Sequence, residues 1–180
     1  RGGDKLEGAL FDFQLHVEGL ITLDVGASTG GFTDCLLQHG TQHVYAVDVG
    51  RGQLATKLRE DRRVTVMERI NARYEYSLGR TVDFLTFDVS FISLKLVVPM
   101  ALNHLKDGGL ALALVKPQFE VGRRSVGKGG IVREPEIRAE AVGSFCRWVI
   151  RNGLHLIGIR RSVIRGETGN QEYFVLFQKT

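Results

Sequence analysis

The stretch "LDVGASTGGFTDCLLQHG", residues 23–40, decides the fold of this chain because it joins a strand end, a glycine turn and a helix. The mostly apolar residues 20–25 predict a short buried strand. Gly26, Gly30 and Gly31 predict a tight turn, and residues 29–40 predict a helix that Gly40 closes just beyond its C-cap. A strand that passes through glycines into a helix indicates a ligand-binding turn of an α/β protein.

The remaining sequence repeats this alternation of strands and helices. Apolar runs predict further strands at 43–49, 64–68, 82–90 and 110–117, with helices near 53–60, over 94–109 and from Pro135 to Asn152. The helix over 94–109 contains a proline and ends in glycines. Two final strands, 154–164 and 171–179, are separated by a polar turn and should pair antiparallel. We predict a doubly wound α/β fold whose seven-stranded sheet is mostly parallel, with an antiparallel last strand.

The composition favours a single globular domain over residues 1–180. The chain is 43% hydrophobic and 24% charged, which suffices for a full core. No apolar run reaches the length of a membrane helix, and no secretory signal opens the chain. Cys35 and Cys146 lie in apolar helical contexts, which predicts two buried thiols and a cytoplasmic protein. The net charge of +4 permits a polyanionic partner.

Three ligands compete for the glycine turn. A dinucleotide loop needs a glycine where this chain has Ser28, whose Cβ obstructs a pyrophosphate. The pattern G-x-S-x-G at 26–30 also matches a hydrolase nucleophile, but only about twenty residues precede its strand, and the histidines are scattered. The third ligand, S-adenosylmethionine, has no phosphate and needs a tight turn plus a carboxylate on the next strand for its ribose. Asp48 supplies that carboxylate, although Asp24 and Asp48 could also be simple caps.

We therefore expect S-adenosylmethionine as the cofactor and no metal ion. The predicted cofactor contacts are Asp24, Gly26, Ser28, Thr29, Gly30, Gly31, Phe32, Asp48 and Asp88.

The acceptor side of the site depends on charged residues at strand ends. Asp88 ends the fourth strand without the Pro-Pro-aromatic segment of base amino-methyltransferases, and no Pro-Cys pair suggests a cytosine carbon-5 enzyme. Lys116 ends the fifth strand after seven mostly apolar residues. A lysine is rarely buried unless it is paired, and otherwise its ammonium reaches solvent. Lys5 and Glu172 are weak signals on their own.

Seven separated segments together resemble one known family. They are Lys5, "LDVGASTGGFTDCLLQHG", "YAVDVG", "DVSFISL", "LVKPQFE", "KGGIVRE" and "GNQEYF". In this combination the chain resembles the FtsJ-like ribosomal RNA ribose 2′-O-methyltransferases, and most closely their TlyA branch, historically labelled haemolysin. The resemblance implies a catalytic Lys-Asp-Lys-Glu tetrad made of Lys5, Asp88, Lys116 and Glu172. It also implies ribosomal RNA or a ribosomal subunit as partner, and a small RNA-binding domain upstream of residue 1.

The tetrad suits the chemistry of a ribose hydroxyl. This hydroxyl is a poor nucleophile at neutral pH and needs a partner for its proton. We assign Lys116 to orient and deprotonate it, with Asp88 and Glu172 holding the two lysines. Lys116→Ala should then abolish transfer and spare cofactor binding.

The long glycine-rich loop 118–134 directly follows Lys116 and carries the densest positive charge of the chain. A loop of this length in a compact domain is usually functional. We expect Arg123, Arg124, Lys128 and Arg133 to contact RNA phosphates, and the alternative is a solvated flexible loop. Phe119 is its only aromatic residue, so base stacking is not a strong expectation. Two non-enzymatic functions stay open: a haemolysin-type membrane-active protein and a non-catalytic RNA-binding domain.

Overall fold

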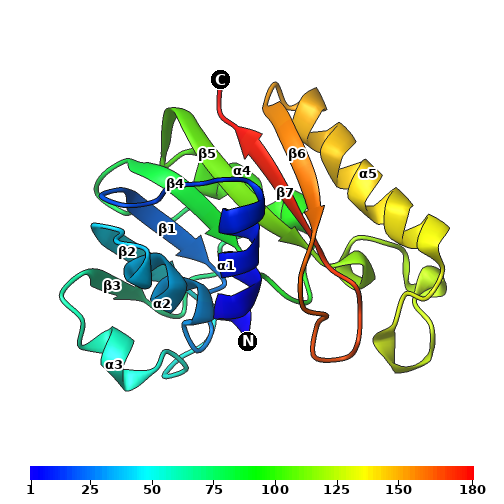
Figure 1. The fold of residues 1–180 in the computed structure, drawn as a ribbon, viewed down its shortest axis with the longest axis horizontal. Helices are drawn as coiled ribbons and strands as arrows, with labels where there is room; N and C mark the ends of the chain where they lie inside the picture. Colours follow the sequence, from blue (N-terminus) through cyan, green and yellow to red (C-terminus); the bar gives the residue numbers. More distant parts are fainter.

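The structure, a computed structural model, describes all residues from 1 to 180 and contains one seven-stranded sheet (Figure 1). The strand order is β3-β2-β1-β4-β5-β7-β6. The strands are β1 (Ile21–Val25), β2 (His43–Val47), β3 (Val64–Met67), β4 (Val82–Phe87), β5 (Leu105–Val115), β6 (His155–Arg161) and β7 (Tyr173–Gln178). The first five are parallel, and β7 lies antiparallel between β5 and β6. The predicted topology is confirmed, including the antiparallel last strand.

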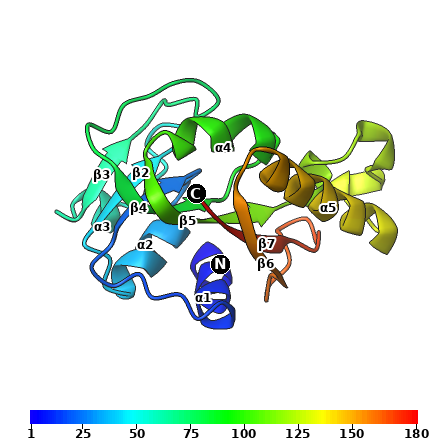
Figure 2. The same cartoon turned by 90° about the horizontal axis from the view of Figure 1, so that it is seen from above.

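Helices cover both faces of the sheet. They are α1 (Gly2–Asp12), α2 (Gly31–Gln38), α3 (Thr56–Arg59), α4 (Leu94–Leu102) and α5 (Pro135–Arg151). Figure 2 shows α1 and α2 on one side of the sheet and α4 on the other. Leu6 and Leu36 pack in one core with Phe84, whereas Val97 and Phe145 belong to the core on the opposite face. Burial on both faces explains why the strands read as continuous apolar runs; all five residues of β1, for example, are buried.

The chain differs from the sequence expectation between α4 and β5. The predicted helix over 94–109 ends at Leu102, and β5 already begins at Leu105. Gly108 does not close a helix: its N–H donates to the Lys179 carbonyl over 2.7 Å, and the Gly109 carbonyl accepts from the Lys179 N–H over 3.0 Å. These bonds tie the C-terminal end of the chain to the start of β5. The glycines therefore serve an antiparallel pairing that a local pattern does not reveal.

The segment 1–19, for which no helix was predicted, begins with α1. Two glycines open this helix, and glycine has poor intrinsic helix propensity. The helix instead gains stability from tertiary packing on α2, because Leu6, Ala9 and Leu10 are buried in the core below it. This packing matters for the site because α1 also carries Lys5.

Candidate active site

Two adjoining hollows lie at the carboxyl ends of the parallel strands, where ligands of such sheets bind. The first, here called the polar hollow, has a volume of about 390 Å³, and Lys5, Asp88, Lys116 and Glu172 are in its wall. The second, the apolar hollow, has a volume of about 490 Å³ and a largely hydrophobic wall that includes Val47, Val49, Ile70 and Val97. Both share Gly26, Ser28, Asp88, Ser90 and Phe91. Ligands in the two hollows would therefore meet beside Asp88.

The glycine turn brings the ends of β1 and β4 into contact. Gly26 has a φ of +85°, and a Cβ at this position would lie 2.4 Å from the backbone oxygen of Asp88. Only glycine fits both the left-handed conformation and the close approach. The turn thus places Asp88 against the bottom of both hollows.

Asp48 immediately follows β2 and lines the apolar hollow. Its Oδ2 accepts the Ser28 N–H over 2.8 Å, and its Oδ1 accepts the Gly50 N–H over 2.7 Å. These two bonds fix the carboxylate beside the glycine turn. Each oxygen retains a second lone pair, so Asp48 can still accept hydrogen bonds from a hydroxylated ligand.

Asp24 occupies a different place from the one expected. The residue is fully buried, lies in neither wall, and accepts hydrogen bonds from the hydroxyls of Thr33 (2.8 Å) and Thr86 (2.9 Å). Burial raises the pKa of Asp24 to about 7, although the two hydroxyl hydrogen bonds oppose this shift. Asp24 therefore joins α2 to β4 beneath the turn. It is not placed to contact a cofactor directly.

The other predicted cofactor residues divide between the hollows. Gly26, Ser28, Thr29, Gly31, Phe32 and Asp88 line the polar hollow, and Asp48 lines the apolar one. Gly30 lines neither and is the N-cap residue of α2.

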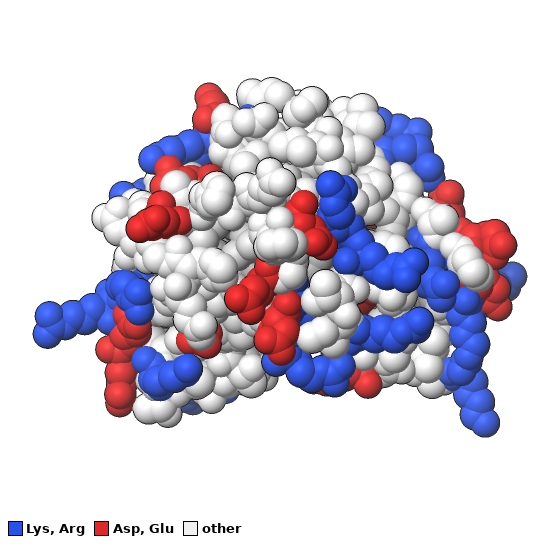
Figure 3. All heavy atoms as spheres, in the orientation of Figure 1, with Lys and Arg blue, Asp and Glu red and all other residues white.

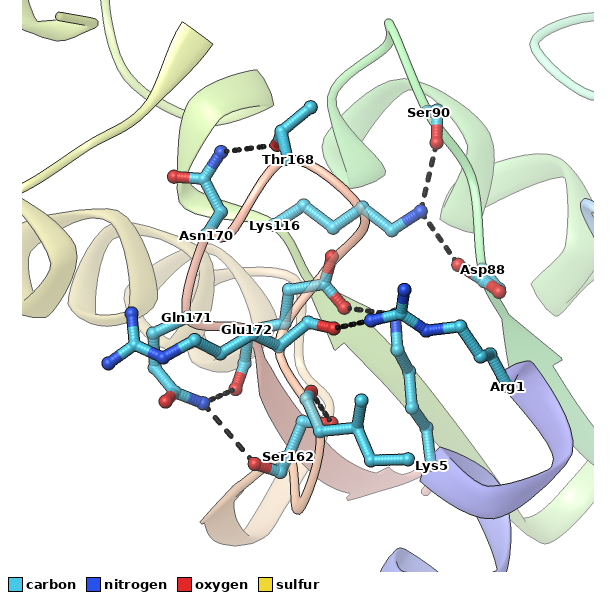
Figure 4. Close-up of polar contacts among 12 residues, drawn as sticks. Arg1, Lys5, Asp88, Ser90, Lys116, Ser162, Thr168, Asn170, Gln171 and Glu172 are labelled. Atoms are coloured by element: carbon cyan, nitrogen blue, oxygen red, sulfur yellow. Dashed lines mark hydrogen bonds and ion pairs between the residues drawn. The ribbon is translucent and has the colours of Figure 1, made fainter. Parts of the chain in front are cut away.

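Lys116 and Asp88 form an ion pair at the ends of β5 and β4. The Lys116 Nζ lies 2.7 Å from Asp88 Oδ1 and donates to the Ser90 hydroxyl over 2.9 Å (Figure 4). The Lys116 side chain is only 11% exposed, which rules out the solvent-directed alternative for this lysine. Its ammonium instead lies in the wall of the polar hollow, beside the residues shared with the apolar one.

Lys5 and Glu172 form a second ion pair, although 167 residues separate them in sequence. Lys5 Nζ lies 2.8 Å from Glu172 Oε2, and the two side chains are 9% and 3% exposed. Lys5 reaches this position because α1 packs tightly on the glycine turn: a Cβ on Gly31 would lie 2.9 Å from the Gly3 nitrogen. The structure thus brings all four predicted tetrad residues to one hollow as two lysine–carboxylate pairs.

A buried polar network supports Glu172 from behind. The Glu172 carbonyl accepts the Ser162 N–H over 2.9 Å. Asn170, which is 1% exposed, accepts the Val132 N–H over 2.9 Å and donates to the Gly130 carbonyl over 2.8 Å. Asn170 therefore joins the loop 118–134, here called the basic loop, to the turn that carries Glu172. The sequence analysis missed this role because a single asparagine in a polar turn has no distinctive pattern.

Two further residues of the polar hollow were missed. Phe91 is 90% exposed, has a φ of +65°, and its ring lies 5.0 Å from that of Phe119. A large exposed aromatic side chain on an unfavourable backbone conformation indicates a functional constraint. Gln118 presents a buried Oε1 with no hydrogen-bond partner. Such an unpaired acceptor in the wall of the hollow is available for a hydrogen bond from a ligand.

The basic loop begins in the wall of the polar hollow, with Gln118 and Phe119, and its cations lie outside that wall. Arg123, Arg124, Lys128 and Arg133 are exposed, and none takes part in the nine ion pairs of the chain. The loop forms three short 3₁₀ turns and is anchored by the buried side chain of Val132. Its cations are therefore available to an anionic partner that extends from the hollow.

Three further features concern metal ligands, membrane spans and the cysteines. No three His, Cys, Asp or Glu side chains gather in an arrangement that could hold a metal ion. None of the five helices is sufficiently long and apolar to span a bilayer. Both cysteines are buried and unpaired, as predicted.

Several known proteins have sequences similar to this one. The 16S/23S rRNA (cytidine-2′-O)-methyltransferase TlyA of Mycobacterium tuberculosis is 48% identical over 177 residues, which cover 97% of this chain and 66% of that protein. Hemolysin A of Brachyspira hyodysenteriae is 42% identical over 180 residues, which cover 98% of this chain and 75% of that protein. A relative from Bacillus subtilis is 49% identical, and the chain spans 63% of its length. The chain thus spans about two thirds of the length of the curated relatives it matches first.

Solved structures show the same fold. A structure from Streptococcus thermophilus has a TM-score of 0.96 and 48% identity, covering this chain completely and 66% of that chain. Fibrillarin from Aeropyrum pernix, solved with natively bound S-adenosyl-L-methionine, has a TM-score of 0.69 at 20% identity and covers 98% of this chain and 76% of its own. The second likeness shows the fold alone. The family model described as FtsJ-like methyltransferase matches residues 1–179. The chain therefore belongs to the FtsJ-like methyltransferase family.

Proposed function

We propose that this domain transfers a methyl group from S-adenosylmethionine to a ribose 2′-hydroxyl of ribosomal RNA. The observation that carries the proposal is the pairing of Lys116 with Asp88 and of Lys5 with Glu172 around one hollow, which adjoins a second, apolar hollow. The mycobacterial relative bears the name of such an enzyme, and the family membership supports the same chemistry for this chain.

The apolar hollow fits the nucleoside part of the cofactor. Val47, Val49 and Ile70 offer an apolar wall for an adenine ring, and Asp48 stands at its edge with free lone pairs for ribose hydroxyls. Gly26, Ser28 and Asp88 line both hollows, so the methionine part would run along the turn toward Asp88. When bound, S-adenosylmethionine supplies a sulfonium-activated methyl group.

The polar hollow fits the acceptor nucleotide. Lys116 has two partners in the structure, Asp88 and Ser90, which fix the direction of its amine. A ribose hydroxyl held by this amine would lie at the junction of the two hollows. The ion pair in the structure holds Lys116 as the ammonium, so this lysine first releases a proton to solvent and then, as the neutral amine, takes the hydroxyl proton while the methyl group is transferred. Lys5, held by Glu172, places a second cation on the same hollow and orients the acceptor through its 2′- or 3′-oxygen or the adjacent phosphate.

Phe91 and Phe119 give the hollow an aromatic surface for the acceptor base. The exposed Phe91 ring stands at the junction of the hollows, and the Phe119 ring supports it from 5.0 Å away. Bases of single-stranded RNA stack on such rings, and enzymes that modify nucleotides in folded RNA take them out of the stack. The pair supports base stacking, which the sequence alone did not strongly predict.

The basic loop would contact the RNA backbone next to the modified ribose. Arg123, Arg124, Lys128 and Arg133 have no internal carboxylate partners, which suits them to phosphates. We further propose that residues 1–180 form one methyltransferase domain, which acts together with an RNA-binding domain. A ribosomal RNA substrate would place this reaction in the cytoplasm.

The test is the identity of the product. Ribosomal subunits from a strain that lacks the gene are incubated with the protein and S-adenosylmethionine, and the RNA is digested to nucleosides for mass spectrometry. The proposal predicts a new nucleoside that carries its methyl group on the ribose. A methyl group on a base would contradict the assigned chemistry. If neither the intact subunits nor deproteinised RNA became methylated, the proposed function would be contradicted altogether.

A further inference from the structure

The edge strand β6 and the turn that follows it carry a second group of unpaired arginines. Arg160 and Arg161 end β6, Arg165 lies in the turn between β6 and β7, and all three are exposed. None of them takes part in an ion pair. Glu167 is the only acidic residue between residues 155 and 171, so this part of the surface has a net positive charge. Figure 3 shows blue side chains gathered over β6 and the lower right of this face.

These arginines stand at the same edge of the sheet as the active site. Strand β6 is antiparallel to β7, which is antiparallel to β5, so the end of β6 lies at the carboxyl edge of the parallel strands. Arg161 pairs in register with Tyr173, the residue after Glu172. The next residue, Ser162, donates its N–H to the Glu172 carbonyl. The arginines thus begin one residue away from the support of the Lys5–Glu172 pair.

The turn continues from the arginines to the polar hollow itself. Glu167 and Thr168 are in the wall of the hollow, and the Arg1 guanidinium, also in that wall, donates to the Arg165 carbonyl over 3.0 Å. On its other side the turn is bonded through Asn170 to the basic loop. The two groups of cations are therefore joined by one ordered piece of chain that borders the hollow.

Strand geometry places the two neighbouring arginines on both sides of the edge. Adjacent side chains of a strand point to opposite faces, and the Arg160 guanidinium lies 4.9 Å from the ring centroid of Phe13, on the α1 side. Arg161 points to the other face. An edge strand with charged side chains is also protected against pairing with other strands. That role concerns only Arg160 and Arg161, which lie on the strand; it does not explain Arg165, which lies in the turn that borders the hollow.

We propose that Arg160, Arg161 and Arg165 form a second phosphate-binding surface for the RNA substrate, distinct from the loop 118–134. The inference rests on the proposed function, because it extends the path of the RNA backbone beyond the acceptor hollow. The RNA runs from the basic loop past the hollow and along the β6 edge, and the arginine forks bind its phosphates.

The test compares two variants that lose the same charge. One carries Arg160→Gln, Arg161→Gln and Arg165→Gln. The control carries Arg62→Gln, Arg80→Gln and Arg151→Gln, three exposed arginines without ion pairs near the amino ends of β3 and β4 and at the end of α5. Binding of deproteinised 16S and 23S RNA is measured over a range of KCl concentrations. The logarithm of the binding constant falls with the logarithm of salt by about 0.7 per phosphate contact on a single strand.

The expected result is a salt slope that is shallower by about 2 in the β6 variant, since three contacts are lost, with little change in the control. The KM for RNA should rise while kcat at saturating RNA is kept. An equal slope in both variants would overturn the inference. So would an unchanged RNA slope combined with lost binding to phosphatidylglycerol vesicles, which would assign the surface to a membrane.

The outcome is separable from that of the proposed function. Methylation by the wild-type protein decides the function, whereas the difference in salt slope decides the surface even if no RNA is methylated. Size-exclusion chromatography of the β6 variant checks the edge-protection role. Oligomers formed without any change in the RNA slope would count against the inference.

Discussion

Strands β4 and β5 carry a lysine–aspartate pair at each end, and the two pairs differ in what surrounds them. Lys106 and Asp83 lie 2.7 Å apart near the amino ends, and Lys116 and Asp88 lie 2.7 Å apart at the carboxyl ends. The Lys106 side chain is 51% exposed, whereas that of Lys116 is 11% exposed. Only the second pair faces a hollow, with another ammonium opposite it.

The Lys106–Asp83 pair shows that a lysine–aspartate ion pair alone does not make a reactive site. Burial would raise the pKa of Asp83, but the Lys106 ammonium and the Ile21 N–H outweigh this effect and lower it. Each oxygen of that carboxylate thus has a partner within the protein, and the exposed pair contributes little to stability. At the other end the same two residue types close a hollow shared with the cofactor side. Position at the carboxyl edge and burial, not the pair itself, make the site.

The largest effect is expected when the second buried pair is broken. Glu172→Ala leaves the Lys5 ammonium buried without a partner, which should cost about 3–5 kcal/mol of folding free energy. Chemical denaturation measures the change. Glu167→Ala, on the same turn but exposed, is the matched control and should stay within about 0.5 kcal/mol of the wild type.

A double variant sharpens this first prediction. Lys5→Met combined with Glu172→Leu removes both charges, so stability should largely recover relative to Glu172→Ala, whereas methyl transfer should be lost together with the Lys5 cation. Normal transfer by this double variant would mean that the Lys5–Glu172 pair, like Lys106–Asp83, has no part in the reaction.

Asp24 offers a third arrangement, a buried carboxyl with hydroxyl partners and no cation. Its pKa is 3.8 in the unfolded reference and about 7 in the folded protein. Between these values the folded state binds more protons, so stability falls as the pH rises through this window. Asp24→Asn cannot ionise and should be more stable than the wild type above pH ~8, by a few kcal/mol at most, with the advantage shrinking toward pH ~4.

Thermal unfolding across this pH range checks the Asp24 prediction. Identical pH profiles for the variant and the wild type would show that folding does not shift the pKa of this carboxyl. Asp107→Asn, an exposed aspartate, provides the control with no expected change in profile.

Phe91 tests whether the acceptor hollow recognises a base. Removing a stacking ring should cost about 1–3 kcal/mol of RNA binding, seen as a KM for RNA raised by roughly tenfold or more. Phe91→Ala is compared with Phe11→Ala, which removes an exposed ring of α1. The affinity for S-adenosylmethionine, measured by calorimetry, should change much less than the KM for RNA. Equal KM values for the two variants would show that Phe91 does not stack on a base of the RNA.

The smallest effect is expected from single cations of the basic loop. Arg123→Gln and Arg124→Gln should each make the salt slope of RNA binding shallower by about 0.7, because each loses one phosphate contact. Turnover at saturating RNA should be kept. If the salt slope were unchanged in both variants, the loop would be a solvated segment without a role in RNA binding.

The sequence predicted those features that depend on local pattern. The apolar run followed by Gly26 predicted a strand that ends in a tight turn. The apolar run before Lys116 placed that lysine at a strand end. The pairing of Lys5 with Glu172 could not be read from a pattern, because it spans 167 residues and depends on a helix that begins with two glycines. The resemblance to a family, and not the spacing, suggested only that the two residues belong to one tetrad.

Other features escaped the sequence because only three-dimensional packing creates them. Asp24 looks like a ligand contact in sequence, but the hydroxyls of Thr33 and Thr86 hold it beneath the turn. Phe91 reads as an ordinary apolar residue, and its exposure depends on the left-handed backbone after β4. The glycines at 108 and 109 resemble a helix end until the C-terminal strand pairs with them.

The most direct measurement compares Lys116→Ala with Lys106→Ala in single-turnover methyl transfer, at saturating RNA and S-adenosylmethionine. A group that handles the proton of the acceptor contributes about 10²–10⁴-fold to rate, so Lys116→Ala should lose at least two orders of magnitude while binding both ligands normally. Lys106→Ala, which breaks the matching pair on the same strands, should react like the wild type. If Lys116→Ala kept near-normal turnover, or if both variants slowed equally, the carboxyl-end pair would have no special part in the reaction.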